Sequence, residues 1–188
     1  TAGDPSLLGL PESASKLVPA GAFAFRDRGV LALPPDRFAT IRVESGGKVQ
    51  VVQSSGRPRD YTHWQMTEPV AAPVDARAVA QLDVLLTRLR AAEFVAASAS
   101  DLAPYGLDRP WAQLTWTFQS VPGQPTPPAG TLLLGSEVPA SRGQRYAMLA
   151  GTERVFTLPP EAVAILVAEL HDHTVLSFPA DQVRRLTD

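Results

Sequence analysis

The sequence predicts an α+β fold, with antiparallel β-meanders and two main helices in the order βββα-ββββα. Two observations lead to this prediction. Short runs of alternating apolar and polar residues are separated by glycine and proline turns, as in antiparallel strands. Two longer segments repeat their apolar residues at helical spacing, and each follows a group of strands. A parallel βαβ sheet would require strands and helices to alternate one by one.

The 188 residues divide into three predicted parts. Residues 1–22 form an extended lead-in that is punctuated by prolines and glycines. Residues 23–170 form one α+β repeat unit. Residues 171–188 either open a second repeat or supply a strand that completes the first.

The first meander has three predicted strands, Phe38–Val43, Lys48–Gln53 and Tyr61–Met66. Glycines in Ser45–Gly47 allow a tight turn between the first two, because glycine accepts positive φ at no steric cost. Alternation selects one face of each strand for the core. The expected core residues are Ala39, Ile41, Val43, Val49, Val51, Thr62, Trp64 and Met66.

The clearest helix is predicted over residues 76–91, after Asp75 as its N-cap. Its expected buried residues are Val79, Leu82, Leu85, Leu86 and Leu89, and its expected outward residues are Arg77, Gln81, Arg88 and Arg90. Phe94 and Val95 are then expected to return the chain to the sheet.

The second meander begins at Trp111, with strands predicted at 111–118, 131–134, 144–149 and 154–158. A proline-rich loop, 121–130, separates the first two. The last helix is predicted over 160–170, where Pro160 at the start lacks an N–H that would be unpaired anyway. Trp64 and Trp116 are expected in the core, whereas Trp111, beside Pro110, is the aromatic residue to test for surface exposure.

Residues 26–36 and 171–181 are similar at a constant offset. Five pairs are identical: Asp27 and Asp172, Val30 and Val175, Leu31 and Leu176, Pro34 and Pro179, and Asp36 and Asp181. Repetition at a fixed offset indicates a modular architecture.

Composition excludes several classes of function. The chain has no cysteine, which excludes thiol catalysis, disulfides and cysteine-bound metals. A net charge of −2 provides no basic footprint for nucleic acid, and no cofactor is expected. No run reaches the roughly 18 apolar residues of a membrane span. Because the first residue is Thr1, we expect a processed or trimmed chain.

Candidate metal and nucleophile motifs have simpler interpretations. His171, Asp172 and His173 could hold a metal ion, but the repeat places Arg26 and Arg28 where the histidines stand, and arginine does not ligate metals. We therefore expect no metal, and a turn or capping role for Asp172. Ser13–Lys16 fits the S-x-x-K pattern of penicillin-binding enzymes but lies in the lead-in, without partner motifs.

Two kinds of site remain open. Loop carboxylates at Asp101, Asp108, Glu137 and Glu153 could form a pair for glycoside hydrolysis, although acidic loop residues are ordinarily solvated. The alternative is a contact loop, with Tyr105, Gly106, Asp108 and Trp111 as its candidate binding residues. A structural anchor would also explain that loop, since Gly106 permits a turn under which Tyr105 and Leu107 pack.

Several motifs together resemble one bacterial family, the domain of unknown function 4340 (DUF4340). They are Trp64–Pro69, Asp101-Leu102 with Tyr105–Pro110, Leu134-Gly135, Gln144–Ala147 and Leu170–Leu176. The most specific is Tyr-Gly-Leu-Asp-Arg-Pro at 105–110. The sequence departs from the family in the histidines beside Asp172, where basic residues are usual, and in the loop 121–130.

The resemblance implies an extracytoplasmic repeat domain, in the periplasm or cell envelope, of a protein whose membrane anchor is absent from this chain. Some members of the family are encoded beside ABC-transporter components. No catalytic residue is established for the family. The expected function is therefore a non-catalytic binding or scaffold module with an envelope protein partner, including transporter components. A glycan or cell-wall hydrolase and a pure spacer are the alternatives.

Overall fold

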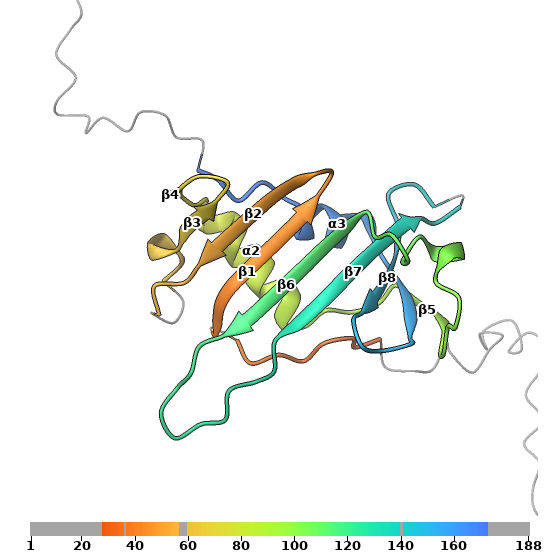
Figure 1. Cartoon of the computed structure of the whole chain (residues 1–188), viewed down its shortest axis with the longest axis horizontal. Coiled ribbons are helices and arrows are strands. Elements are labelled where there is room, and N and C mark those ends of the chain that lie inside the picture. Colours follow the sequence, from red (N-terminus) through yellow and green to blue (C-terminus); the bar gives the residue numbers. More distant parts are fainter. Residues whose placement is uncertain (1–27, 36, 57–59, 140, 173–188) are drawn as a thin grey trace, which may run out of the picture.

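One nine-stranded antiparallel sheet forms the centre of the computed structural model, which describes residues 28–35, 37–56, 60–139 and 141–172 (Figure 1). The strands are β1 (Phe38–Ser45), β2 (Lys48–Gln53), β3 (Gln65–Glu68), β4 (Ala72–Pro73), β5 (Glu93–Ala96), β6 (Ala112–Phe118), β7 (Gly130–Glu137), β8 (Arg145–Leu149) and β9 (Val155–Leu158). Their spatial order is β4-β3-β2-β1-β6-β7-β8-β9-β5. The predicted α+β class is confirmed.

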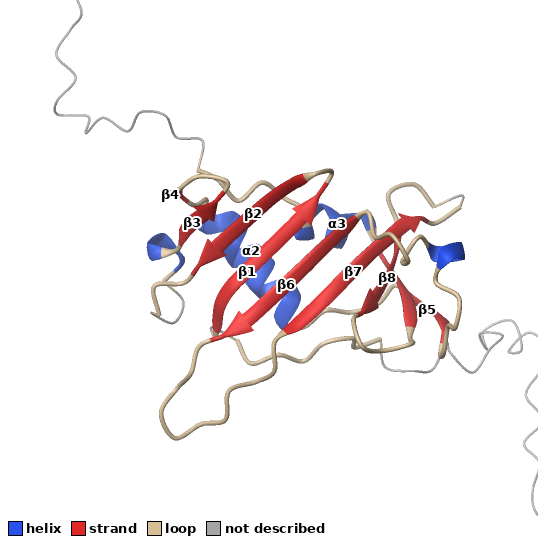
Figure 2. Cartoon of the chain, in the orientation of Figure 1, coloured by secondary structure: helices blue, strands red, loops and turns tan. Residues whose placement is uncertain are grey.

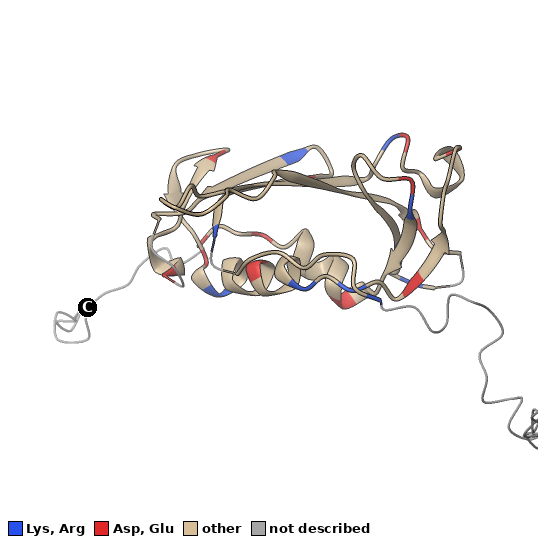
Figure 3. Cartoon of the chain, turned by 90° about the horizontal axis from the view of Figure 1, so that it is seen from below, with Lys and Arg blue, Asp and Glu red and all other residues tan. Residues whose placement is uncertain are grey.

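Both helices, α2 (Ala76–Thr87) and α3 (Pro160–Leu166), lie on the same side of the sheet (Figures 2 and 3). The layer between sheet and helices is apolar, and Ile41, Leu82 and Leu114 in it are fully buried. Trp64 and Trp116 belong to this core, as predicted. In Figure 1, β1, β2 and β6 lie in front of both helices, and no helix formed by the described residues lies on their other side.

The structure corrects the predicted buried faces of β2 and of the start of β1. Val52, not Val49 or Val51, is buried, because the turn at Gly46-Gly47 pairs Ser45 with Lys48 and so places Val52 opposite Ile41. A one-residue shift moves every side chain of a strand to the other face. In β1 a bulge near the start likewise buries Phe38 and leaves Ala39 half-buried.

The predicted strand over 61–66 is wrong in its first half. Residues Tyr61–His63 form a 3₁₀ turn, η1, so Thr62 is exposed rather than buried, while Trp64 and Met66 are in the core as expected. Both helices are also shorter than predicted. After Thr87 the chain turns to meet residues 28–33, and after Leu166 it extends toward β2.

Asp75 caps α2 as predicted. Its Oδ1 accepts hydrogen bonds from the backbone N–H groups of Arg77 (2.9 Å) and Ala78 (3.1 Å). Such a cap satisfies donors that have no partner within the helix. We expect Asp75→Ala to lower the free energy of unfolding by about 1 kcal/mol. Chemical denaturation should measure this loss, and Asp75→Asn, which keeps an acceptor, should recover most of it. A stability equal to the wild type for Asp75→Ala would contradict the capping role.

Candidate functional site

The loop 98–110, which contains the candidate contact residues Tyr105, Gly106 and Asp108, crosses the helix-free side of the sheet over β7, β8 and β9. It contains a short 3₁₀ turn, η2 (Ala103–Tyr105), whose start is fixed by Asp101, since its Oδ1 accepts from the N–H of Ala103 at 3.0 Å. Leu107 is buried there in a second apolar cluster with Met148 and Val155. The loop thus covers one half of this side of the sheet.

Two glycines let the loop approach β7 closely. A Cβ on Gly135 would lie 2.1 Å from the carbonyl oxygen of Tyr105, a contact that no side chain can make. Gly106 has φ +63°, in the left-handed region that favours glycine, and its Cα faces the backbone of Ser136. The loop is therefore clamped onto β7, which is the anchor role predicted for Tyr105 and Gly106.

The aromatic residues of this region divide into a packed pair and an exposed ring. Tyr105 meets Tyr146 of β8 edge-on, with ring centroids 5.1 Å apart. Trp111 is 39% exposed, and the guanidinium carbon of Arg145 lies 3.7 Å from the centroid of its ring. Arg145 also donates to the carbonyl oxygen of Gly135 at 2.9 Å. Trp111 thus borders the clamp and retains an accessible surface.

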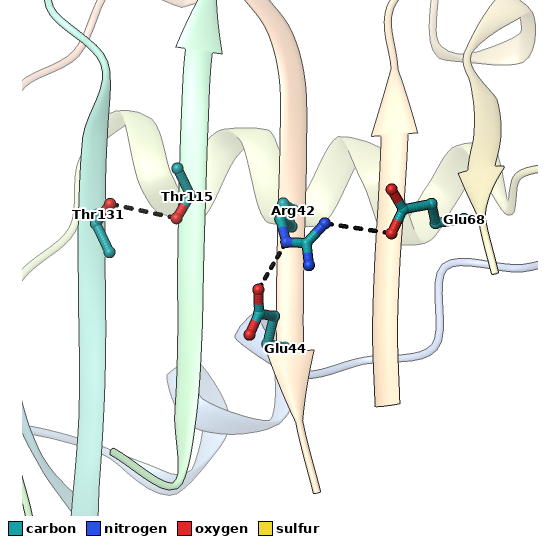
Figure 4. A network of polar contacts seen from close by, with 5 residues as sticks. All are labelled: Arg42, Glu44, Glu68, Thr115 and Thr131. Carbon is teal, nitrogen blue, oxygen red and sulfur yellow. Dashed lines mark hydrogen bonds and ion pairs between the residues drawn. The ribbon is translucent and has the colours of Figure 1, made fainter. Parts of the chain in front are cut away.

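The other half of the helix-free side, which we call the open face, carries polar side chains from β1, β3, β6 and β7 (Figure 4). Arg42 lies at its centre and pairs with Glu44 at 2.6 Å and with Glu68 at 3.2 Å. Threonine hydroxyls pair across neighbouring strands, Thr40 with Thr117 at 2.6 Å and Thr115 with Thr131 at 3.2 Å.

Charge and apolar surface are combined on the open face. The hydrogen bond to Glu44 raises the pKa of Arg42 above its ordinary value. Desolvation, the next largest effect, opposes this increase, and the charges of Glu44 and Glu68 add to it. The arginine therefore stays cationic at any physiological pH. Val49 and Val51, which the hairpin register turns away from the core, add half-buried apolar side chains beside it. The open face can thus offer charge, hydroxyl groups and apolar contact together.

Residues from the motifs that suggested a family meet in the clamp. Tyr105, from the loop motif, lies against Gly135 of β7 and Tyr146 of β8, and these two residues belong to two other motifs. A comparison with protein families matches residues 64–188 to the family described as Domain of unknown function (DUF4340). The chain belongs to this family. The motif at 105–110, the most specific of the DUF4340 motifs in this chain, is therefore explained by the close packing of the loop on β7.

Two further comparisons give no match for this DUF4340 chain. No curated protein and no solved structure is similar to it at the significance required. Within the part of the chain that the structure describes, no helix is long and apolar enough to cross a membrane.

The loop carboxylates of the DUF4340 domain mostly hold turns. Asp101 accepts from the N–H of Ala103 where η2 begins, Glu137 accepts from the N–H of Gly143 at 2.7 Å, and Glu153 accepts from the hydroxyl of Ser98. Asp108 is exposed. Carboxylates engaged in this way position backbone segments, and these contacts do not favour an acid–base pair.

The predicted metal and nucleophile motifs lie largely beyond the described residues. His171 forms an antiparallel bridge with Val74, and the backbone N–H of Asp172 donates to the carbonyl oxygen of Pro73 at 3.1 Å. His173 and Ser13–Lys16 are outside the described residues. Among residues 28–35, 37–56, 60–139 and 141–172, no three histidine or acidic side chains gather as a metal site would require.

One polar network in the core was not predicted. Asp83 of α2 is 2% exposed and accepts hydrogen bonds from the hydroxyls of Tyr61 (2.5 Å) and Thr87 (3.1 Å). Helical spacing contained the signal, because Asp83 and Thr87 follow Val79 at intervals of four residues and so share its buried face. The network connects η1 to α2.

Proposed function

We propose that this DUF4340 domain is a non-catalytic binding module, and that the open face is its contact surface. The partner is a protein of the bacterial envelope, including transporter components, and the domain acts outside the cytoplasm. The observation that carries the proposal is the asymmetry of the sheet, which has helices on one side and, on the other, an open face beside the clamped loop.

The composition of the open face supports this proposal. Threonines 40, 115, 117 and 131 provide hydroxyl groups on short, stiff side chains, so little side-chain entropy is lost on contact. The ion pairs of Arg42 are solvent-accessible, with side-chain exposures of 40–53%, and pairs of that kind add little to folding stability. Charged groups of this kind contribute more to binding, where they determine how a charged partner aligns on the surface.

Replacing the two central threonines tests the proposal. We expect Thr115→Lys with Thr131→Lys to weaken partner binding at least tenfold, which corresponds to about 1.4 kcal/mol, because two long cations would fill the contact surface. The measurement is binding of the purified domain to envelope protein solubilised from the source bacterium, quantified against wild type. The free energy of unfolding should decrease by about 1 kcal/mol, because the two new cations lie directly opposite each other and beside Arg42, and the fold should remain intact.

The matched control is Val84→Lys, at a residue of α2 that is 69% exposed and lies on the helical side of the sheet. This variant should bind like the wild type. Equal weakening by the helix variant and by the threonine variants, or no effect of either, would refute the proposal. A glycan hydrolase, the alternative function, would instead lose turnover of cell-wall fragments on Asp101→Asn or Asp108→Asn.

A further inference from the structure

The connection between β6 and β7, residues 119–129, is a long loop that we call the arm. Neighbouring antiparallel strands can be joined by a turn of roughly two residues, so this length is not needed to close the hairpin. The arm projects beyond the ends of both strands (Figure 1). It contains four prolines and no charged residue. Long loops of this kind in a compact domain are usually functional.

Arg37 and Gln119 hold the base of the arm against the start of β1. Nη1 of Arg37 donates to Oε1 of Gln124, and Nη2 donates to the carbonyl oxygen of Gln119, both at 3.2 Å. Nε2 of Gln119 in turn donates to the carbonyl oxygen of Phe38 (3.0 Å) and to the hydroxyl of Ser54 (2.8 Å). The arm therefore leaves the sheet in a defined direction.

A turn divides the arm into two parts. The N–H of Gln124 donates to the carbonyl oxygen of Val121 at 3.1 Å, across Pro122 and Gly123. Gly123 has φ +75°, which is the left-handed conformation that the third position of such a Pro-Gly turn requires. After this turn, residues 125–129 return to β7 without forming a helix or a strand.

The prolines restrict the second part of the arm to one backbone conformation. A proline ring fixes φ at about −65°, and the residue before a proline is kept in the extended region. Pro125, Pro127 and Pro128 together impose these limits on every residue of 124–128. The polyproline II helix meets both limits, and its backbone carbonyl groups are available to a partner because the helix has no internal hydrogen bonds.

The period of this helix, about three residues per turn, separates one edge that faces the protein from an edge that faces solvent. Gln124 and Pro127 share the first edge, where Gln124 is bonded to Arg37 and Pro127 is half-buried. Pro125 and Pro128 share the second edge, about 9 Å apart, and both are exposed. They are the two prolines of a P-x-x-P motif, the pattern that aromatic-lined grooves bind.

We propose that residues 124–129 are a ligand segment that docks, through Pro125 and Pro128, into an aromatic-lined groove of a partner protein. A segment that is already held in its bound conformation loses little entropy on binding. Because the arm is uncharged, its binding depends on the proline rings and on hydrogen bonds to its carbonyl groups. The arm lies outside the open face, so this function is additional to the one proposed above.

Photo-crosslinking from the arm tests this proposal in the full chain. A photoreactive residue replaces Thr126, which is exposed and lies between the two docking prolines, and the protein is illuminated in envelope preparations of the source bacterium. We expect one discrete adduct, with the same yield at about 50 mM and about 500 mM salt, because no charge of the arm takes part. Absence of an adduct, or a yield that decreases steeply with salt, would overturn the proposal.

Two matched proline substitutions distinguish docking from a loop that only connects β6 and β7. Pro128→Ala removes a docking proline, whereas Pro127→Ala removes its neighbour and keeps the P-x-x-P spacing. Each full-length variant is added without the photoreactive residue, as a competitor for the adduct. We expect Pro128→Ala to compete at least about tenfold more weakly than the wild type, and Pro127→Ala to remain within about threefold of it.

The melting temperatures of both variants should stay within about 3 °C of the wild type, because the substitutions lie in a surface loop. Unequal competition by two equally stable variants then reports on the contact itself. Equal competition by Pro128→Ala, Pro127→Ala and the wild type would show that the arm is only a connection, and equal weakening by both variants would exclude docking through the P-x-x-P edge.

Discussion

Gly135→Ala is expected to destabilise the domain by about 3 kcal/mol, because a methyl group at that position has no space. Its Cβ would lie 2.1 Å from the carbonyl oxygen of Tyr105 and 3.1 Å from Cγ of Leu107. The first of these is a backbone atom and cannot rotate away, so the loop must lift from β7. Thermal unfolding should show a decrease of about 10 °C in melting temperature.

The control for this variant is Gly151→Ala, in the turn between β8 and β9. Gly151 has φ +81°, so alanine is strained there, but no atom lies within 4 Å of the new Cβ. We expect a cost of about 1 kcal/mol from the backbone alone. If Gly135→Ala cost no more than this control, the loop would not be clamped as described. The intrinsic tryptophan fluorescence, to which Trp64, Trp111 and Trp116 all contribute, should also change in Gly135→Ala and stay unchanged in the control.

Asp83→Ala is expected to have a similarly large effect, a loss of about 3 kcal/mol. The substitution removes a buried carboxylate and leaves the hydroxyls of Tyr61 and Thr87 without their acceptor, and each unsatisfied buried group costs about 1–3 kcal/mol. Urea unfolding followed by circular dichroism measures the loss. Wild-type stability for Asp83→Ala would show that the network does not hold η1 against α2.

Two neighbouring substitutions separate the network from general effects on the helix. Tyr61→Phe removes one hydrogen bond and keeps the ring, so about 1 kcal/mol is expected. Val84→Ala, at the next residue of α2, changes an exposed side chain and should stay within about 0.5 kcal/mol of wild type. Losses that increase from Val84→Ala through Tyr61→Phe to Asp83→Ala would assign the effect to the buried carboxylate.

The pattern of apolar and polar residues predicted a strand or helix of this fold well where the pattern within that one element is regular. The strand at 112–118 alternates cleanly, and all four residues of its predicted apolar face are buried. The predicted buried face of a strand was wrong where contacts with residues distant in the sequence decide its register. Val49 and Val51 form the better apolar alternation in β2, yet pairing with β1 places Gln50 inward, where its amide binds Ala168 and Leu170 at the end of α3.

The candidate site was predictable in part. The sequence motif at 105–110 predicted the close turn at Gly106, which is present. The sequence alone left the exposure of Trp111 to be tested, and the ring is partly exposed. The open face was not predicted, because it depends on β1 lying between β2 and β6, and those strands are far apart in the sequence. Ion pairs such as that between Arg42 and Glu68 become visible when the order of strands is known.

Site-specific photo-crosslinking tests the proposed contact surface most directly. A photoreactive residue is placed at Thr115 on the open face or at Val84 on the helical side, and the protein is illuminated in envelope preparations of the source bacterium. A binding module that uses the open face predicts one discrete crosslinked partner from position 115 and none from position 84. The same partner captured from position 84 but absent from position 115 would contradict this account.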